Sequence, residues 1–283
     1  MLKAYAPAKI NLILRVLGKR RDGFHEIFSL IQRVSLFDTL YFKTISIPKI
    51  ELKTNCSFLP TDKSNLIHEA AHLFLKEVHN NFGIEIYLIK RIPLSSGLGG
   101  GSSDAATTLL CLNNLFGHPF SKRRLLEMAA FLGSDVPFFI FKSTAIVTGK
   151  GEKVKPLDLE LPFWYLILCP PIKVSTSEVY NSWKLTKGGN KTKIPKREQI
   201  LECLENDLED FAIYSFPEIG LAKGMLEEVR AKKVVMTGSG GAVFGVFLTK
   251  KEAYSAREKL DSPKGWKVFL VKGLPSAQNS KEF

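Results

Sequence analysis

A glycine-rich segment near the middle of the chain constrains the fold more than any other feature. It runs Pro93-Leu-Ser-Ser-Gly-Leu-Gly-Gly-Gly-Ser-Ser-Asp104. Apolar residues alternate with more polar ones over 84–88, which predicts a half-buried strand before the segment. Apolar residues recur at helical spacing over 105–116, which predicts a helix after it. The sequence therefore predicts a strand, a glycine-rich loop and a helix in that order.

Such a loop is suited to bind phosphate. Glycine lets the backbone approach a ligand closely, and the start of a helix offers unpaired N–H groups and the positive end of its dipole. The two commonest versions do not fit, because no lysine follows the glycines and Ser102 stands where a dinucleotide-binding loop has its last glycine. The segment is interpreted as a phosphate loop of another type, with a flexible turn as the alternative. Ser102 and Ser103 are expected to cap the helix and to reach a phosphate or a metal ion.

Strand-like and helical patterns alternate without the strict rhythm of a doubly wound sheet, which favours an α+β fold. The length suits two domains, and we expect an N-terminal domain over 1–158 and a C-terminal domain over 159–283. The stretch 184–196, rich in lysine, is expected to be a loop or linker. The expected helices are 64–78, 105–116, 121–131, 199–211, 217–231 and 252–260, and the expected strands are 2–18, 27–42, 84–88, 145–149, 161–169, 234–236, 242–248 and 266–271.

The chain carries a formal net charge of +12, which suggests an anionic partner: nucleic acid, an anionic lipid or a phosphorylated small molecule. A solvated basic surface is the simplest interpretation. The basic runs 19–21 and 122–124 are short and lack interleaved aromatic residues, so we expect no nucleic acid partner. The oligomeric state stays open.

The sequence gives no sign of a membrane or of export. Every apolar run is far shorter than the roughly 20 residues of a membrane-spanning helix, and the N-terminus lacks the apolar stretch of a secretory signal. We therefore expect a cytoplasmic protein without a membrane partner. The four cysteines lie far apart and form no C-x-x-C pair, which argues against a zinc ribbon or a thioredoxin-like site.

The run His68-Glu69-Ala-Ala-His72 matches the H-E-x-x-H signature of zinc metalloproteases. Two histidines one helical turn apart can bind zinc, with the glutamate as base. These histidines, however, share a helix row with Lys76 opposite the apolar face, and Leu75 stands where a longer form of the signature has glycine. We expect a solvated helix face here, and a zinc hydrolase is kept as an alternative.

Three segments resemble the three motifs of the GHMP small-molecule kinases. They are Ala6-Pro-Ala-Lys-Ile-Asn-Leu12, the glycine-rich segment 93–103 and Thr237-Gly-Ser-Gly-Gly241. Two more, 22–26 and 133–139, resemble a member of that family with a cytidine-linked substrate. The resemblance implies transfer of the γ-phosphoryl group of ATP to the 2-hydroxyl of a cytidine diphosphate-linked methylerythritol. It also implies Mg²⁺; no motif shows the ligands of this ion, and Ser103 is a candidate.

The resemblance also implies catalytic roles. Asp135 would orient or deprotonate the attacking hydroxyl. Lys9 would keep that aspartate ionised and offset charge on the transferred group, since an opposite charge favours the ionised carboxylate. Asn11 would help to place the hydroxyl. Without the surrounding motifs, Asp135 would be interpreted as a turn or cap residue and Lys9 as a surface lysine.

Binding roles follow in the same way. Phe24, where the family usually has tyrosine, would sandwich the cytosine with Tyr180, and His25 would hydrogen-bond the edge of the base. Asn65 is expected to be a helix N-cap, and the family also places an adenine contact there. The other residues that would bind ATP are Pro93, Leu94, Ser95, Ser96, Gly97, Leu98, Gly99, Gly100, Gly101, Ser102 and Ser103.

Two further functions stay open besides the cytidine-linked kinase. A kinase of the same family acting on another alcohol or phosphate would share the loop and the Lys9–Asp135 pair but lack the cytosine contacts. A basic nucleotide- or RNA-binding module without catalysis would bind ATP or RNA and turn nothing over; the segment around Asp135 argues against it.

Overall fold

The computed structural model describes residues 1–78, 82–183 and 192–276, and the chain forms two compact units. Unit 1 comprises Met1–Ala8, Leu36–Leu94 and Gly99–Lys142, and unit 2 comprises Lys9–Ser35, Ser95–Leu98 and the chain from Ser143 onward. The units interleave in sequence because two long strands, β1 (Leu2–Lys19) and β2 (His25–Ile45), each contribute to both. The two domains expected over 1–158 and 159–283 are continuous in sequence and differ in kind from these units. The boundary after residue 158 stays a prediction.

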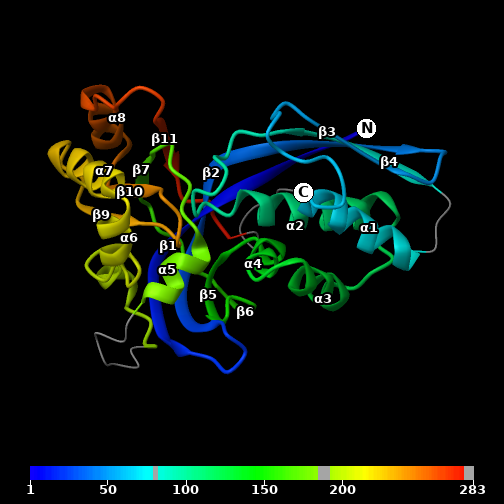
Figure 1. Ribbon diagram of the computed structural model, residues 1–283, viewed down its shortest axis with the longest axis horizontal. Helices are drawn as coiled ribbons and strands as arrows, with labels where there is room; N and C mark the ends of the chain where they lie inside the picture. Colours follow the sequence, from blue (N-terminus) through cyan, green and yellow to red (C-terminus); the bar gives the residue numbers. More distant parts are fainter. Residues whose placement is uncertain (79–81, 184–191, 277–283) are drawn as a thin grey trace. The chain divides into compact units, whose positions relative to one another are not determined.

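Unit 1 packs helices against strands (Figure 1). β4 (Gly83–Ile89) pairs antiparallel with the end of β2, and β3 (Ile50–Thr54) pairs parallel with β4. The helices pack on one another and are α1 (Leu66–Val78), α2 (Gly100–Leu115), α3 (Lys122–Leu132) and α4 (Val136–Phe141). α1 buries Ile67, Ala70 and Phe74 on one face, as its helical spacing predicts. This arrangement brings the end of β4 and the start of α2, which flank the glycine-rich segment, into one unit.

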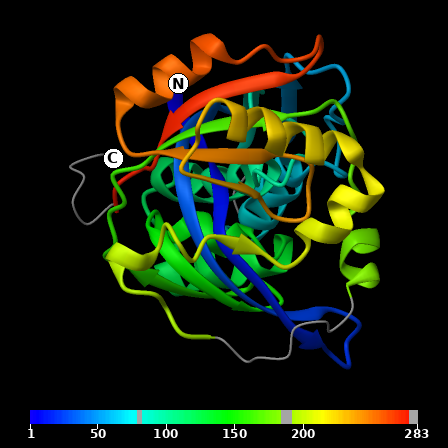
Figure 2. The ribbon, with the colours of Figure 1, turned by 90° about the vertical axis from the view of Figure 1, so that its left-hand side faces the viewer.

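Unit 2 is built on an antiparallel sheet with the order β11-β7-β10-β9, seen with its helices in Figure 2. Its strands are β7 (Trp164–Cys169), β9 (Lys233–Met236), β10 (Val243–Phe247) and β11 (Lys267–Lys272). The helices of this unit are α5 (Thr176–Ser182), α6 (Glu209–Ser215), α7 (Pro217–Glu228) and α8 (Lys250–Lys259). Leu168, Val243, Ala222, Leu226 and Ala253 meet in its core, so the apolar faces of sheet and helices cover each other.

The same unit contains the remaining strand pairs. β5 (Thr144–Gly149) pairs antiparallel with β2 and with β6 (Lys153–Leu157), and β8 (Glu205–Asn206) pairs parallel with β1. Among residues 1–78, 82–183 and 192–276, no helix is both long enough and apolar enough to cross a membrane.

One predicted helix is wrong. The stretch 199–211 holds a short 3-10 turn (Arg197–Gln199), strand β8 and only the start of α6. The side chain of Asn206 explains the extended conformation, because its amide nitrogen donates to the carbonyl oxygens of Met236 and Gly238, each at 2.8 Å. Its amide oxygen accepts from the backbone N–H of Leu208 at 3.0 Å. A local pattern cannot reveal partners that lie 30 residues away in the chain.

The glycine-rich segment also differs from expectation. α2 begins at Gly100, so the last glycines and both serines form its first turn. The N-cap is Gly99, with no side-chain capping bond, and the prediction that Ser102 and Ser103 cap the helix is wrong because both lie inside it. Of the expected linker 184–196, residues 184–191 lie outside the described residues, as do 277–283 of the chain end.

Candidate active site

The glycine-rich loop adopts a backbone conformation that its glycines make possible. Gly97 and Gly99 have φ values of 78° and 69°, in the left-handed region. A Cβ atom on Gly97 would lie 2.4 Å from the carbonyl oxygen of Thr237, so only glycine fits there. Ser96 and Leu98 are buried, whereas Leu94 is exposed. The loop is thus fitted closely against the third motif, 237–241, within unit 2.

The first turn of α2 supplies groups that could hold a phosphate. The first N–H groups of any helix have no intrahelical acceptor, and Gly99 offers no side chain to cap them. The hydroxyl of Ser103 is buried and has no hydrogen-bond partner among the described residues. Buried hydroxyl groups normally have a partner. This orphaned hydroxyl therefore fits a ligand that the loop receives.

Lys9 and Asn11 form a buried polar cluster in unit 2. The ammonium nitrogen of Lys9 donates to Oδ1 of Asn11 at 2.6 Å, and both residues are only 4% exposed. The amide nitrogen of Asn11 donates to the hydroxyl of Ser29 at 2.9 Å. The hydroxyl of Thr237 accepts from the backbone N–H of Asn11 at 2.9 Å and lies 3.3 Å from Oδ1. Lys9 is thus no surface lysine, and the orientation of Asn11 is fixed from both ends.

The cluster is also joined to the loop. The backbone N–H of Lys9 donates to the carbonyl oxygen of Leu98 at 2.9 Å, and the backbone N–H of Ala242 donates to the carbonyl oxygen of Ser96 at 3.2 Å. The first motif and Ala242, which directly follows the third motif, therefore both bond to the middle of the glycine-rich loop. This is the main structural support for treating the three motifs as one site.

Asp135 immediately precedes α4, but its side chain makes no capping hydrogen bond to that helix. Pro137 occupies the first turn of α4, where a missing N–H costs nothing. A cap is therefore not the role of this carboxylate. Asp135 belongs to unit 1 and Lys9 to unit 2, so the pairing of these two residues stays a prediction.

The predicted base-binding residues include an aromatic group in unit 2. The rings of His25 and Tyr180 lie 5.4 Å apart at 34°, and Trp183 meets the His25 ring edge-on at 6.1 Å. Burial lowers the pKa of His25, and the charge of Lys19 lowers it further. Both effects favour the neutral form of His25. Trp183 was missed by the sequence reasoning, which had no pattern to distinguish it from a core residue.

Phe24, the other predicted base-binding residue, is more exposed than His25. Its ring is 50% exposed, so it is not a core residue, and the ammonium group of Lys150 lies 4.5 Å from the ring centroid. An exposed ring with a cation on it is available for stacking by a base. Whether Phe24 and Tyr180 sandwich a cytosine stays a prediction.

Asn65 is the N-cap of α1, as predicted. Its side-chain oxygen accepts from the backbone N–H of Ile67 at 2.9 Å, and its amide nitrogen donates to the carbonyl oxygen of Pro60 at 2.7 Å. Both polar atoms of the side chain are thus engaged within the protein, and each keeps capacity for one more bond. The adenine contact stays a prediction.

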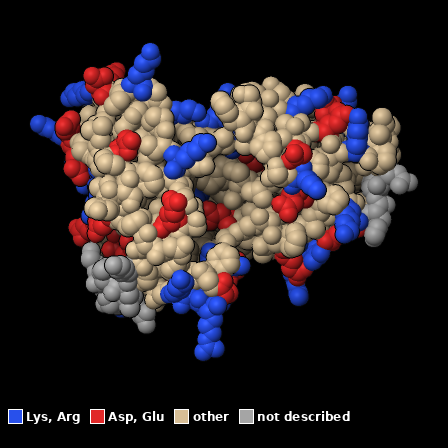
Figure 3. Space-filling view, viewed as in Figure 1, with Lys and Arg blue, Asp and Glu red and all other residues tan. Residues whose placement is uncertain are grey.

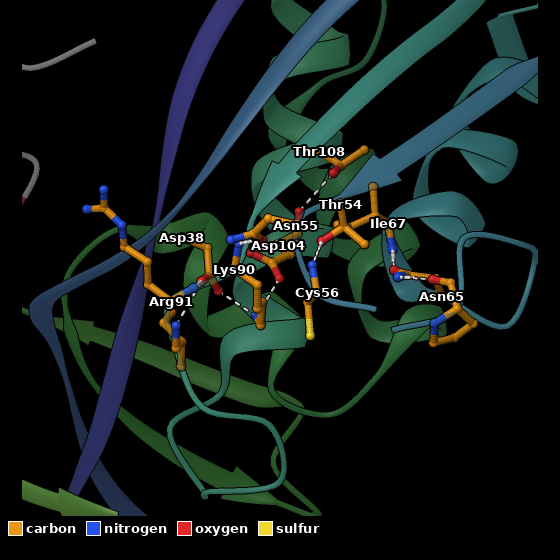
Figure 4. A network of polar contacts seen from close by, with 12 residues as sticks. Asp38, Thr54, Asn55, Cys56, Asn65, Ile67, Lys90, Arg91, Asp104 and Thr108 are labelled. Carbon is orange, nitrogen blue, oxygen red and sulfur yellow. Dashed lines mark hydrogen bonds and ion pairs between the residues drawn. The ribbon is translucent and has the colours of Figure 1, made fainter. Parts of the chain in front are cut away.

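A buried ionic cluster in unit 1 was missed entirely (Figure 4). Nζ of Lys90 lies 2.5 Å from Oδ2 of Asp38 and 2.8 Å from Oδ2 of Asp104. All three side chains are at most 5% exposed. The sequence holds one signal that could have found it: Asp38 is the only charged residue in the largely apolar stretch 34–42.

Ionisation of this cluster is strongly perturbed. The pKa of Asp104 is raised to about 8. Burial is the largest cause; the charge of Asp38 also raises the pKa, and that of Lys90 lowers it. The pKa of Lys90 is raised in turn by the two carboxylates, against the lowering effect of its burial. The protonated form of Asp104 is thus favoured by its burial and by the neighbouring Asp38.

The H-E-x-x-H match lies on α1 without the surroundings of a zinc site. His72 is exposed, and Nδ1 of His68 is buried with no hydrogen-bond partner among the described residues. Within residues 1–78, 82–183 and 192–276, no group of three or more His, Cys, Asp or Glu side chains could hold a metal ion. Burial and the neighbouring His72 lower the pKa of His68.

Comparison with known sequences agrees with this set of motifs. A profile of the GHMP kinases N terminal domain matches residues 65–143, and one of the GHMP kinases C terminal domain matches residues 193–264. A 4-diphosphocytidyl-2-C-methyl-D-erythritol kinase of Syntrophotalea carbinolica is 40% identical over 94% of this chain and 96% of its own. One of Nitrosospira multiformis is 42% identical over 96% of this chain and 91% of its own.

Solved structures give the same result. A crystal structure of a 4-(cytidine 5'-diphospho)-2C-methyl-D-erythritol kinase has a TM-score of 0.82 and 34% identity, covering 96% of this chain and 100% of its own. Homoserine kinase from Cytophaga hutchinsonii has a TM-score of 0.70 at 18% identity, covering 96% and 94%, which shows the fold alone. The expected two-domain α+β fold and the family resemblance are thus confirmed. The chain belongs to the GHMP kinase family of ATP-dependent small-molecule kinases.

Proposed function

We propose that this chain transfers the γ-phosphoryl group of ATP to the 2-hydroxyl of 4-diphosphocytidyl-2-C-methyl-D-erythritol, giving the 2-phosphate and ADP, in the non-mevalonate route to isopentenyl diphosphate. The relatives with that activity in their names match nearly the whole chain. The structural observation that carries the proposal is the hydrogen bond from the backbone N–H of Lys9 to the carbonyl oxygen of Leu98. This bond links the buried Lys9–Asn11 cluster to the phosphate loop. The reaction would take place in the cytoplasm, where ATP is supplied.

The chemistry follows from the groups available. The hydroxyl oxygen of the acceptor forms a bond to the γ-phosphorus, and the bond from that phosphorus to ADP breaks. Because such a transition state is loose, positioning and charge compensation supply most of the catalysis. Asp135 would accept the proton of the hydroxyl, Lys9 would offset charge on the transferred group, and Asn11 would hold the hydroxyl in place.

Recognition of the cytosine would rest on the aromatic residues of unit 2. Tyr180 and Phe24 would stack on the base, and a neutral His25 presents one N–H donor and one ring-nitrogen acceptor. That pattern matches the edge of cytosine, which offers an acceptor beside an amino group. The lowered pKa of His25 supports this role, because the charged ring would have no acceptor.

The residues of the loop fit a Mg²⁺ ion if the nucleotide phosphates and water supply most of its ligands. The described residues contain no acidic cluster for a metal, but Mg²⁺ commonly takes one or two protein oxygens besides phosphate and water. The unpartnered hydroxyl of Ser103 would be such an oxygen. When bound, the ion would neutralise charge on the β- and γ-phosphates.

A panel of acceptors tests the proposal. ATP consumption and phosphorylated product are measured with 4-diphosphocytidyl-2-C-methyl-D-erythritol, the same alcohol without its cytidine diphosphate, homoserine and mevalonate. We expect turnover with the first alone. Turnover with another acceptor and none with the cytidine compound would reject the proposed substrate and favour another kinase of the family.

A further inference from the structure

The buried cluster of Asp38, Lys90 and Asp104 holds both ends of the glycine-rich loop. We propose that Lys90 is a positioning residue for ATP: its ammonium group, between the two carboxylates, fixes the loop and the first turns of α2 at the place that receives the phosphates. This inference rests on the proposed function, in which the loop binds the phosphates of ATP.

The chain entering the loop is tied to Asp38. Oδ1 of this carboxylate accepts from the backbone N–H groups of Arg91 and Ile92, at 2.6 and 2.9 Å, while Oδ2 binds the ammonium group of Lys90. Three successive residues are thus held by one side chain of β2. Ile92 directly precedes the loop, so the point at which the loop leaves the sheet is fixed.

The chain leaving the loop is tied to the same ammonium group. Asp104 lies in the first turns of α2, and its Oδ2 accepts from Nζ of Lys90 at 2.8 Å (Figure 4). Gly100, the first residue of α2, packs directly on that nitrogen, since a Cβ atom there would lie 2.8 Å from it. One atom therefore contacts both the first residue of the helix and a side chain one turn further on.

Stability alone gives a poor reason for this cluster. Burying three ionisable groups is costly, and a buried ion pair is often no more stabilising than well-packed apolar side chains. Oδ1 of Asp104 also has no hydrogen-bond partner among the described residues. What the cluster does provide is a fixed geometry at the start of a helix that faces an anion.

The first experiment compares Lys90→Met with Lys53→Met. Lys53 also pairs with an acidic residue of β4, Glu85, but is 60% exposed and lies outside the site. We expect Lys90→Met to raise the KM for ATP by about 10-fold, which is about 1.4 kcal/mol, and to leave the KM for the alcohol unchanged. Lys53→Met should leave both unchanged. Equal KM values for ATP in Lys90→Met and the unaltered protein would overturn the proposal.

The second experiment remains decisive if Lys90→Met does not fold. Asp104→Leu is close in size but removes the oxygen that accepts from Nζ of Lys90. We expect it to raise the KM for ATP about 3-fold or more and to leave the KM for the alcohol unchanged. An unchanged KM for ATP in Asp104→Leu would overturn the proposal.

Direct binding separates this inference from the proposed function. The Kd of a non-hydrolysable ATP analogue is measured for the unaltered protein, Lys90→Met and Asp104→Leu. Failure of the cytidine-linked alcohol as substrate, with the expected changes in Kd, would reject the proposed substrate and support the role of Lys90. Turnover of that alcohol with unchanged Kd values would support the proposed substrate and overturn the role of Lys90.

Discussion

At the scale of single residues, the site combines polar groups that have hydrogen-bond partners within the protein with polar groups that have none among the described residues. Both polar atoms of the Asn11 side chain are bonded within the protein, which fixes where the Lys9 ammonium group lies. The hydroxyl of Ser103 and one oxygen of Asp104 have no partner among the described residues. Engaged groups define a geometry, and unengaged ones indicate where a ligand or a proton completes it.

Asp135→Asn tests the predicted base. The carboxamide keeps the shape of the side chain but cannot accept the hydroxyl proton, so kcat is expected to fall at least ~10²-fold. The Kd for ATP should stay near that of the unaltered protein. Asp158→Asn, which alters an exposed carboxylate elsewhere, is the matched control and should change neither value. Full turnover by Asp135→Asn would remove this residue from the catalytic group.

Tyr180→Ala tests the base pocket. Loss of a stacked ring costs roughly 1–3 kcal/mol of base binding, so the KM for the cytidine-linked alcohol should rise by about 10-fold and that for ATP should not change. Tyr180→Phe retains the ring and is expected to behave like the unaltered protein. Tyr214→Ala, an exposed ring in the same unit, serves as the control. Equal shifts in both KM values would place Tyr180 outside the pocket.

At the scale of elements, the sequence pattern predicts best where one segment decides its own conformation. The helix expected over 121–131 is α3, and the hydroxyl of Ser121 caps it by accepting from the backbone N–H of Arg124. The strand and helix around the glycine-rich loop were also predicted, because each shows a regular period. The helix expected over 199–211 failed because long-range bonds to Asn206 decide that segment.

The same distinction explains which site residues the sequence could predict. Motif residues such as Lys9 and Asp135 were predicted because they lie in continuous segments that resemble a family. Asp38, Lys90 and Asp104 were missed because 52 residues separate the first two and the fold alone brings them together. Trp183 carries no local signal that separates a ligand-facing ring from a packed one. Contacts between distant segments are thus the part that a single sequence does not show.

Gly97→Ala tests the fit of the loop against the third motif. The change requires an alanine in the left-handed region, which costs about 1–2 kcal/mol, and places its Cβ against the carbonyl oxygen of Thr237. Gly117→Ala has a similar φ, 74°, but nothing lies within 4 Å of its Cβ, so it isolates the cost of the backbone conformation. We expect Gly97→Ala to lower the unfolding free energy more than Gly117→Ala and to weaken ATP binding. Equal stabilities and normal ATP binding would contradict the close fit.

At the scale of the whole molecule, the chain carries a net charge of +12. On the face shown in Figure 3, lysine and arginine side chains are interspersed with acidic ones and form no continuous stripe. That face therefore presents no continuous basic groove of the kind that binds nucleic acid.

Stability of the whole molecule should depend on pH through Asp104. Folding raises the pKa of this group from its ordinary 3.8 to about 8. Between these values the native state holds a proton that the unfolded state has lost, so the unfolding free energy falls as the pH rises. The slope is at most about 1.4 kcal/mol per pH unit. Urea unfolding at pH 5.5, 6.5, 7.5 and 8.5 measures it.

Asp104→Asn isolates this contribution from those of other groups. His25 and His68 have lowered pKa values, so they make stability rise with pH near 6, but they do so equally in both proteins and cancel in the difference. Asp62, whose pKa is lowered by its bonds to Ser64, is ionised throughout this range in both states, so Asp62→Asn should leave the slope unchanged. We expect the unfolding free energy of the unaltered protein, measured relative to that of Asp104→Asn, to fall steadily from pH 5.5 to 8. A constant difference would mean that Asp104 is already ionised at pH 5.5, and that the buried cluster carries its full negative charge beneath the phosphate loop at neutral pH.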